Sequence, residues 1–353
     1  LLSFLYKRYK YFNGDVSKGL VIVPTELIPD NGKKLEGIVL ELAHQNGLEA
    51  LFLDWLETAN IFCNSLVDRI VPGKLPADEE KKMEEKLGCR DELMIMSEVY
   101  RLWAIEAADE KIKEVLSFYQ ADEGVVIVPD INVHRELKLR LLNGSHTFTC
   151  GLAYLAGFRT VKEAMGNDEF VSFITGLMMN EIAPSITGDN LTLGQAKEFA
   201  NKVLDRYRNP FLEHQWLSIT LQYTSKMGMR NVPVIAEYYE RNKAVPQRMA
   251  VGFAAYLLFM KCKQKEDGKY YGVANGQTYV INDNNAAYYA EKWNNLSFDK
   301  LVPEVLANIG FWRRDLSQLP GFSEGIKEQL ETLLNDGAAG TLSKMVTDKA
   351  STE

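Results

Sequence analysis

The sequence lacks a hydrophobic run long enough to cross a lipid bilayer, and it shows no secretory signal peptide. Its longest apolar run, MAVGFAAYLLFM at residues 249–260, falls well short of the ~20 residues that a membrane helix needs. It also lacks a C-x-x-C pair, because the cysteines lie far apart, at Cys63, Cys89, Cys150 and Cys262. Dispersed cysteines favour reduced thiols over a disulfide framework or a zinc site. We therefore expect a cytoplasmic protein with no membrane partner.

Positive charge is not in excess either. The sequence has 40 Lys and Arg against 48 Asp and Glu, a net charge of -8 at pH 7. Nucleic-acid binding needs a basic face, so we expect no nucleic-acid partner. No cluster of ligands has the spacing of a metal site, and we expect no metal. The 353 residues, of which 46% are hydrophobic and 25% charged, are enough for two soluble domains with cores of their own.

Residues 1–133 alternate short β-rich runs with helical patterns. We expect extended segments at residues 19–24, 60–73 (ended by Pro72 and Gly73), 91–106 and 123–131. Two helices are expected between them, an exposed charged one at 77–88 and an amphipathic one at 33–47, whose apolar face is Leu35, Ile38, Val39, Leu42 and Ala43. This alternation is typical of an α/β layer.

From residue 134 onward helical periodicity dominates. The patterns predict helices within residues 161–184, 192–210, 211–226, 245–264 and 323–337. One strand-like interruption, residues 268–283, contains Asn275-Gly276 between β-rich arms and predicts a hairpin. Residues 337–353 have the composition of a frayed tail. The expected fold class is thus α/β plus all-α, with domains at 1–133 and 134–353.

The stretch ELKLRLLNGSHTF, residues 136–148, places a cation, an amide and an imidazole among leucines. On a helix, Lys138 and His146 lie roughly 80° apart at ~100° per residue, and Asn143 is three residues before His146, so the three side chains can converge. There is a plainer alternative. Lys138 would then share a solvated face with neighbouring arginines, and Asn143-Gly144 would simply end the helix.

Five blocks together resemble a known family: PTELIPDNG, FCNSLVDRIVPG, KLRLLNGSHT, NPFLEH and VPQRMAVGFAAYL. They look like the mannitol dehydrogenase group of polyol-specific long-chain dehydrogenases, from about residue 10 to residue 335. The resemblance implies the C-terminal part of a Rossmann-type domain followed by a helical substrate domain. It also implies metal-free hydride transfer with NAD. Within the group, the blocks are similar to the branch that interconverts D-tagaturonate and D-altronate in hexuronate catabolism.

The resemblance assigns roles to the three polar residues. Lys138 would be the general acid and base, a task that suits a partly buried lysine. Asn143 would donate a hydrogen bond to the developing alkoxide. His146 would orient the substrate or the lysine. Two other activities stay open, fructuronate reduction and mannitol oxidation. So does a third possibility, a non-catalytic helical module without the cofactor half.

Two features depart from the family pattern. Where the metal-free polyol enzymes carry a second oxyanion-hole Asn, this chain has Leu27, preceded by Glu26. By resemblance this segment, with Glu26, Leu27 and Asn31, would contact the NAD cofactor. In addition, no G-x-G-x-x-G loop follows a strand near the start. We expect that the chain begins after that loop and binds NAD poorly on its own.

A hexuronate substrate also requires a cation for its carboxylate. Asp68 and Arg69 lie near the end of a predicted strand, where α/β proteins bind ligands, and Arg69 is the candidate cation. Alternatively, the two residues form an ion pair on the surface. His214, Lys226 and Arg230 form a second set, in which the two cations are four residues apart and could clamp an anion. The alternative for this set is a basic, solvated helix end. The oligomeric state is left open by the sequence.

Overall fold

The computed structural model describes residues 1–71 and 73–350, so Pro72 and the last three residues of the predicted tail lie outside it. The packing of the chain divides it into two units, Leu1–Arg135 and Glu136–Glu353. Each unit is described by itself. No helix in the described ranges is both long and apolar enough to cross a membrane.

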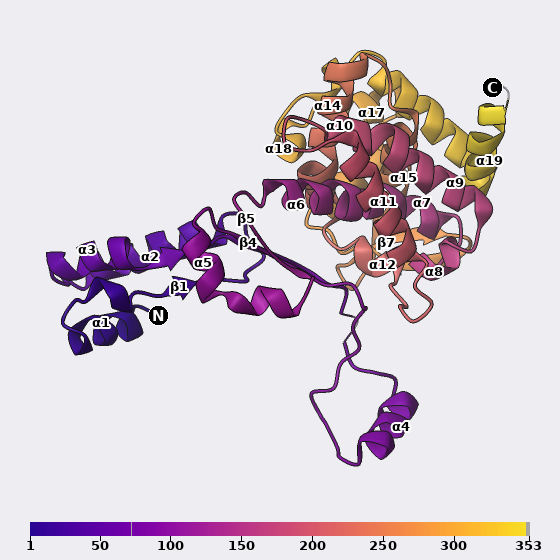
Figure 1. Cartoon of the computed structure of the whole chain (residues 1–353). Helices are drawn as coiled ribbons and strands as arrows, with labels where there is room; N and C mark the ends of the chain where they lie inside the picture. Colours follow the sequence, from indigo (N-terminus) through magenta and orange to yellow (C-terminus); the bar gives the residue numbers. More distant parts are fainter. Residues whose placement is uncertain (72, 351–353) are drawn as a thin grey trace. The chain divides into compact units, whose positions relative to one another are not determined.

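Unit 1 contains short strands with helices around them (Figure 1). Its strands form two sheets: β1 (Val21–Ile22) pairs in parallel with β2 (Ile61–Phe62), and β4 (Leu102–Glu106) pairs antiparallel with β3 (Ser65–Asp68) and parallel with β5 (Val125–Val128). Its helices are α1 (Leu2–Tyr11), η1 (Val16–Lys18), α2 (Asn31–Gln45), α3 (Ala50–Ala59), α4 (Ala77–Leu87), α5 (Glu110–Val115), η2 (Ser117–Ala121) and, at the boundary, α6 (Asn132–Glu136).

The apolar face predicted for residues 33–47 is narrower in the structure. Val39 and Ala43 are buried in a core that they share with Phe52 and Trp55 of α3. Ile38 and Leu42 also belong to the predicted face but are exposed. Helix α2 packs against its neighbours along only part of its apolar face. The sequence pattern therefore predicts more buried residues than the structure has.

Unit 2 is mostly helical. Its helices are η3 (Leu137–Gly144), α7 (Ser145–Leu155), α8 (Val161–Ala164), α9 (Asp168–Gly176), η4 (Leu177–Ile182), α10 (Ala183–Ser185), α11 (Leu193–Tyr207), α12 (Trp216–Ile219), α13 (Tyr223–Lys226), η5 (Met227–Asn231), α14 (Val232–Asn242), α15 (Gln247–Phe259), α16 (Ala286–Asn295), α17 (Phe298–Leu306), α18 (Ile309–Trp312), η6 (Leu316–Gln318) and α19 (Phe322–Ala350). A small antiparallel sheet joins β6 (Lys263–Gln264), β7 (Tyr270–Ala274) and β8 (Gln277–Val280).

Helix α15 forms the centre of unit 2, and nearly all of its residues are buried. It lies so close to α7 that a Cβ on Gly252 would come within 2.8 Å of the Phe148 carbonyl oxygen. Glycine is therefore needed at this crossing. The predicted hairpin is confirmed, because Asn275 and Gly276 both adopt positive φ between β7 and β8.

Two predictions for unit 2 were wrong. Residues 211–226 do not form one helix: α12 and α13 are separated at Gln222, which has a φ of 51°. The predicted frayed tail is instead helical as far as Ala350, after a break at Gly337. Leu342 and Thr341 are buried on this last stretch. Tertiary packing thus orders a segment whose local composition predicts disorder.

Candidate active site

Lys138 and Asn143 lie on η3, which is a π-helix that continues without a break into α7. Gly144 has helical angles, φ -67° and ψ -45°, so the alternative in which Asn143-Gly144 ends a helix is wrong. In an α-helix, residues five apart point about 140° away from each other at ~100° per residue. The i→i+5 bonding of a π-helix instead stacks such residues one turn apart. The π-helix therefore brings Lys138 and Asn143 onto one face.

A second π-helical turn, η5, packs against η3 and carries Arg230. The two segments are joined by Arg140, whose Nη1 donates to the carbonyl oxygens of Met229 (2.7 Å) and Arg230 (2.9 Å). The Nε of Arg140 also binds the Glu136 carboxylate at 2.9 Å. Arg140 thus links the two segments. It is one of the arginines that the plainer alternative placed with Lys138 on a solvated face, and for Arg140 that alternative is wrong.

The Arg230 guanidinium is held by one hydroxyl. Its Nη1 donates to Thr147 Oγ1 at 3.2 Å, and that hydroxyl donates to the Asn143 carbonyl oxygen at 2.8 Å. A chain of hydrogen bonds therefore links the proposed substrate cation to the backbone of the proposed oxyanion donor. Burial lowers the pKa of Arg230, which shows that its charge is poorly solvated.

His146 is 5% exposed and lies in an aromatic box. Its ring stacks on Tyr207, with centroids 4.1 Å apart, and meets the edges of His214 at 5.4 Å and Trp216 at 5.8 Å. Burial first, and then the neighbouring His214 and cations, hold the pKa of His146 well below its ordinary value. The imidazole is therefore neutral. Its buried Nε2 has no hydrogen-bond partner within the described part of the chain.

Lys226 and His214 complete the cluster. The Lys226 ammonium donates to the Ile219 carbonyl oxygen at 2.9 Å, and burial followed by the charge of Arg230 lowers the pKa of Lys226. Burial followed by the charge of Lys226 lowers the pKa of His214. The predicted alternative for the two cations, a solvated helix end, is wrong because both are partly buried.

The electrostatics of this cluster favour an anion. In the ranges that the structure covers, the Lys226 and Arg230 side chains bind only a carbonyl and a hydroxyl oxygen, and no carboxylate. The histidines beside them are neutral. The charge of Asp283 favours the charged form of Lys226 but is a smaller effect than burial, which lowers the pKa of Lys226. Partly buried cations without a directly bonded carboxylate are costly unless a ligand supplies one.

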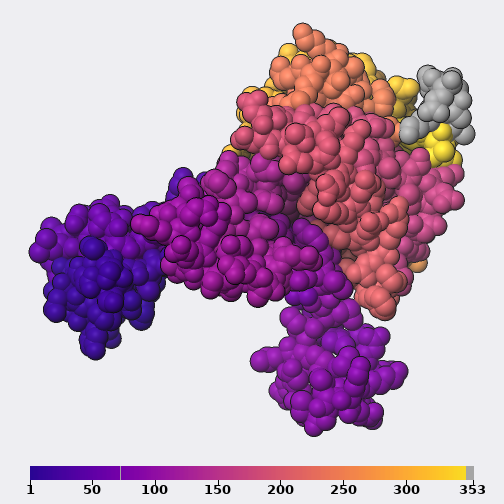
Figure 2. Space-filling model, viewed as in Figure 1, coloured from indigo at the N-terminus to yellow at the C-terminus, as the bar shows by residue number. Residues whose placement is uncertain are grey.

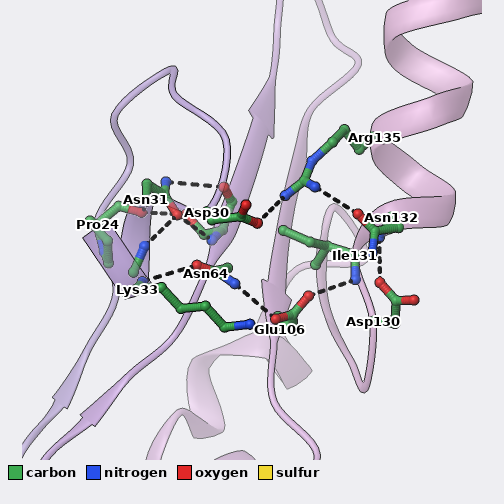
Figure 3. A network of polar contacts seen from close by, with 12 residues as sticks. Pro24, Asp30, Asn31, Lys33, Asn64, Glu106, Asp130, Ile131, Asn132 and Arg135 are labelled. Carbon is green, nitrogen blue, oxygen red and sulfur yellow. Dashed lines mark hydrogen bonds and ion pairs between the residues drawn. The ribbon is translucent and has the colours of Figure 1, made fainter. Parts of the chain in front are cut away.

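The predicted cofactor residues lie in unit 1, on the loop between β1 and α2. Leu27 at its centre is 81% exposed. Asn31 is buried and fixes this loop: its Nδ2 donates to the carbonyl oxygens of Pro24, Glu26 and Ser65 at 3.0–3.1 Å, and its Oδ1 accepts from the amide of Ser65 (Figure 3). The Asn31 side chain therefore shapes the loop and is not available to a ligand.

The N-terminus of α2 is already capped by side chains. Asn31 Oδ1 accepts from the Gly32 amide, and Asn64 Oδ1 accepts from the Lys33 amide at 3.2 Å. Asn64 in turn donates to Glu106 Oε1 at 2.9 Å, at the end of β4 (Figure 3). These amides cannot also bind a pyrophosphate, although a helix N-terminus is the usual place for one.

Asp68 and Arg69 also belong to unit 1, at the end of β3. Asp68 is buried, whereas Arg69 is exposed and donates from Nε to the Glu98 carbonyl oxygen at 2.9 Å. The structure brings Asn143, His146, His214, Lys226 and Arg230 into one region of unit 2. In unit 1, Asp68 and Arg69 remain predictions for the substrate, and Glu26 and Leu27 remain predictions for the cofactor.

Sequence reasoning missed four residues that shape the site. They are Arg140, Thr147, Tyr207 and Trp216. Thr147 had a weak signal, because it lies four residues after Asn143 and next to His146. The two aromatic residues gave none, since they reach His146 from distant parts of the chain.

Two family models match the chain. The mannitol dehydrogenase Rossmann domain matches residues 1–116, and the mannitol dehydrogenase C-terminal domain matches residues 130–334. Among solved structures, the fold is similar to Pseudomonas fluorescens mannitol 2-dehydrogenase in ternary complex with NAD and D-mannitol (TM-score 0.67, 23% identity, 93% of this chain and 62% of that one). It is also similar to D-sorbitol dehydrogenase in substrate-free form (TM-score 0.69, 18% identity, 97% of this chain and 65% of that one).

Two curated relatives are more similar in sequence. Altronate oxidoreductase of Bacillus subtilis (strain 168) is 36% identical over 330 residues, which are 92% of this chain and 64% of the relative. Altronate oxidoreductase of Shigella flexneri is 35% identical over 347 residues, 96% of this chain and 68% of the relative. The chain thus spans about two thirds of the length of these relatives. The comparisons confirm the expected fold class and the resemblance on which it rested.

Proposed function

Because the chain belongs to the mannitol dehydrogenase family, we propose that it contributes the substrate site of an NAD-dependent enzyme that interconverts D-tagaturonate and D-altronate. Relatives named altronate oxidoreductase, at 35–36% identity over more than nine tenths of the chain, support this activity. The observation that carries the proposal is the pair of partly buried cations, Lys226 and Arg230, beside His146.

These two cations fit a sugar acid better than a polyol. A hexuronate and a hexitol differ at one end, where the first has a carboxylate and the second a hydroxymethyl group. A carboxylate would satisfy the ammonium of Lys226 and the free nitrogens of Arg230 with charge-assisted hydrogen bonds. A hydroxymethyl group would leave both charges partly desolvated and without a directly bonded carboxylate. The site should therefore discriminate between the two substrates.

Three residues carry the proposed chemistry, and two of them, Asn143 and His146, lie near the cations. Lys138 takes the proton of the secondary alcohol during oxidation and returns it to the carbonyl oxygen during reduction. Asn143, one π-turn away, donates a hydrogen bond to the same oxygen as negative charge develops on it. His146 stays neutral, so it carries no charge that would repel the cations. A neutral imidazole can accept a hydrogen bond from a substrate hydroxyl or donate one to it.

NAD, when bound, supplies the hydride acceptor for this chemistry. The described residues fit the cofactor in part. The exposed loop with Glu26 and Leu27 lies at the carboxyl end of β1, which is the edge where α/β sheets bind ligands, and Asn31 shapes that loop. The capped N-terminus of α2 does not offer a pyrophosphate site. We propose that the loop contacts the cofactor through Glu26 and Leu27.

The test compares kcat/KM on two substrates, first in the parent protein and then in variants that lack one of the two cations. In an enzyme that also carries the NAD-binding loop, the kcat/KM for tagaturonate should exceed that for fructose by at least about 10²-fold, the scale of a desolvated charged contact. Replacing Lys226 or Arg230 with Met should remove most of this ratio and leave the weak fructose rate nearly unchanged. Arg208→Met, which removes a surface cation paired with Asp205, is the matched control. Equal rates on tagaturonate and fructose would refute the sugar-acid assignment, and a preference for fructuronate would move it to another hexuronate.

A further inference from the structure

The helix that presents the two substrate cations begins at a break in the chain. Helix α12 ends at Ile219, and α13 begins only after Gln222, which is in the left-handed conformation with φ 51° and ψ 50°. A residue with a side chain is strained in this conformation and keeps it only where surrounding contacts hold it. From Lys226, α13 continues directly into η5 with Arg230. Because α12 cannot set the direction of α13 across the break, other contacts must fix where the cations lie.

The loop between β8 and α16 supplies such contacts. We call residues 282–284 of this loop the clasp. The Gln222 amide donates to the Asn282 carbonyl oxygen at 2.9 Å. The Gln222 side chain donates from Nε2 to Asn284 Oδ1 at 3.1 Å and accepts at Oε1 from the Asn284 amide at 3.3 Å. The clasp therefore holds the strained residue at the break through both its backbone and its side chain.

Asp283, the middle residue of the clasp, binds the first turn of α13 itself. Side chains fill the spaces between the helices of unit 2, as Figure 2 shows for one face, and within this packing Asp283 is 8% exposed. Its Oδ2 accepts from the Thr224 amide at 2.7 Å, and its Oδ1 accepts from the Asn285 amide at 2.8 Å, directly before α16. The first amides of a helix lack partners within the helix, and a carboxylate binds them strongly. One carboxylate therefore ties the start of α13 to the start of α16.

Thr224 is also held from a second direction. Its Oγ1 accepts from the Tyr256 hydroxyl at 2.9 Å, and Tyr256 belongs to α15, the central helix of unit 2. The Tyr256 hydroxyl is bound in turn to the hydroxyl of Tyr289 on α16. The start of α13 therefore keeps an anchor in the core when the side chain of Asp283 is replaced.

Asp283 also places negative charge near Lys226. Burial and then the charge of Arg230 lower the pKa of Lys226, whereas Cys150 and Asp283 act in the opposite direction. Burial raises the pKa of the Cys150 thiol to about 12, so this thiol is uncharged near neutral pH. The titratable groups that act on Lys226 or respond to its charge are Arg230 of η5, Cys150 and His146 of α7, His214 and Asp283. Since both histidines are neutral, Asp283 is the group of this set that favours the protonated ammonium near pH 7.

On the basis of the proposed function, we propose that Asp283 is a positioning residue of the substrate site, which holds Lys226 where its ammonium can meet the carboxylate of a sugar acid. Asp283 does so without touching the substrate, because its two oxygens bind backbone amides. An ammonium has three N–H donors, and Lys226 gives one of them to the Ile219 carbonyl oxygen, so donors remain for a ligand. The clasp thus orders the cation before the substrate arrives, which lowers the cost of binding.

Kinetics on two substrates test this role. In an enzyme that also carries the NAD-binding loop, Asp283→Asn should raise the KM for tagaturonate about tenfold or more, the scale of a weakened contact to a charged group. The kcat should stay within about threefold, and the KM for fructose within about twofold, because fructose has no carboxylate. A loss of folded protein would instead lower the kcat on both substrates and leave both KM values unchanged.

Asp315→Asn is the matched control for the kinetics. Asp315 also caps a helix of unit 2, since it accepts from the Ser317 amide at 2.9 Å at the start of η6. Its replacement should change neither KM. An Asp283→Asn enzyme whose KM values for tagaturonate and fructose change equally, or not at all, would overturn the positioning role.

Titration of Lys226 by NMR tests the same role without a substrate. In the chain with isotope-labelled lysine, the Lys226 signal is the one that disappears in Lys226→Arg. In Asp283→Asn this signal should titrate at a lower pH than in the parent, because the negative charge is gone. Asn284→Ala removes the side-chain bond to Gln222 but keeps the charge of Asp283, so the signal should titrate as in the parent. An unchanged titration in Asp283→Asn would contradict the proposal.

The two measurements separate this proposal from the proposed function. If the parent enzyme turns over tagaturonate and fructose equally well, the sugar-acid assignment fails, and the titration decides alone whether Asp283 acts on Lys226. If the parent prefers tagaturonate but Asp283→Asn affects both substrates equally, the positioning role fails while the sugar-acid assignment stands.

Discussion

The Arg230 guanidinium reaches the hydroxyl of Thr147, 83 residues away in the sequence, at 3.2 Å. The same hydroxyl donates to the Asn143 carbonyl oxygen, so it serves the proposed carboxylate cation and the proposed catalytic helix together. Thr147 is completely buried. Its role is therefore to position Arg230, and it need not touch the substrate itself.

This relationship predicts a selective effect of Thr147→Val, which keeps the shape and removes the hydroxyl. The KM for tagaturonate should rise about tenfold, the equivalent of one lost hydrogen bond to a charged group. The KM for fructose should change less than about twofold, because fructose has no carboxylate to bind. Thr149→Val is the control, since Thr149 is equally buried on α7 but donates only to backbone carbonyl oxygens. Equal effects of the two variants would show that Thr147 is merely structural.

Lys138→Ala should lower kcat by at least about 10²-fold, because proton transfer by a positioned base contributes on this scale. The loss should appear in kcat more than in KM, since the proton moves only in the chemical step. Steady-state rates of NADH oxidation give both values. Lys202→Ala removes an exposed lysine that pairs with Glu198, and it should change neither. Activity above about a tenth of the parent value would exclude Lys138 as the acid and base.

Tyr207 supports His146 in two separable ways. Its hydroxyl donates to the Leu142 carbonyl oxygen at 2.8 Å and lies 2.9 Å from Ser145 Oγ, whereas its ring stacks on the imidazole. Tyr207→Phe should lower the free energy of unfolding by ~1–2 kcal/mol, because a buried carbonyl loses a donor. The KM for tagaturonate should stay within a few-fold of the parent value. Tyr207→Ala removes the stacked ring as well, so KM should rise further; denaturant unfolding and steady-state kinetics distinguish the two.

A buried carboxylate should make stability depend on pH. Glu181 accepts hydrogen bonds from the amides of Arg248 and Met249 at the start of α15, and burial raises its pKa to about 7. The folded state therefore binds more protons than the unfolded state between the ordinary value of 4.5 and about 7. The free energy of unfolding therefore falls by up to ~3 kcal/mol as pH rises through this window, and it is level above it.

Unfolding by urea between pH 5 and 8 measures this effect. In Glu181→Gln the downward slope should disappear, because the amide does not titrate. Glu198→Gln is the control: Glu198 is exposed, and a hydrogen bond from Lys202 lowers its pKa, so its loss cannot remove a slope of this sign. A slope that persists in Glu181→Gln would assign it to another group.

The cysteines should differ sharply in reactivity. Cys89 is exposed after α4, whereas the other three are buried, and burial raises the pKa of Cys150 to about 12 and that of Cys262 to about 11. Thiolate, and not thiol, reacts with disulfide reagents. A thiol titration near pH 8 should therefore show one fast phase, which Cys89→Ser abolishes. A fast phase that remains would show that a buried thiol is accessible.

The sequence by itself determined much of this protein. The change from alternating strands and helices to helical periods, the Asn275-Gly276 turn and the exposed charged helix α4 follow from local patterns, and the structure has all three. The Lys-x4-Asn-x2-His spacing identified the segment that carries the proposed chemistry, because residue types and their separation are properties of the chain alone.

Tertiary structure decided the rest. The π-helical turns that align Lys138 with Asn143 and hold Arg230 have no local signal, since an inserted residue in a helix is stabilised by what packs around it. The neutral state of His146 depends on Tyr207 of α11, Trp216 of α12 and His214 in the segment between these helices, all of which surround the ring. Likewise, Leu342 is buried in a segment whose composition predicted a frayed end. Burial, ring contacts and pKa shifts arise between residues distant in sequence, and periodicity within one segment cannot encode them.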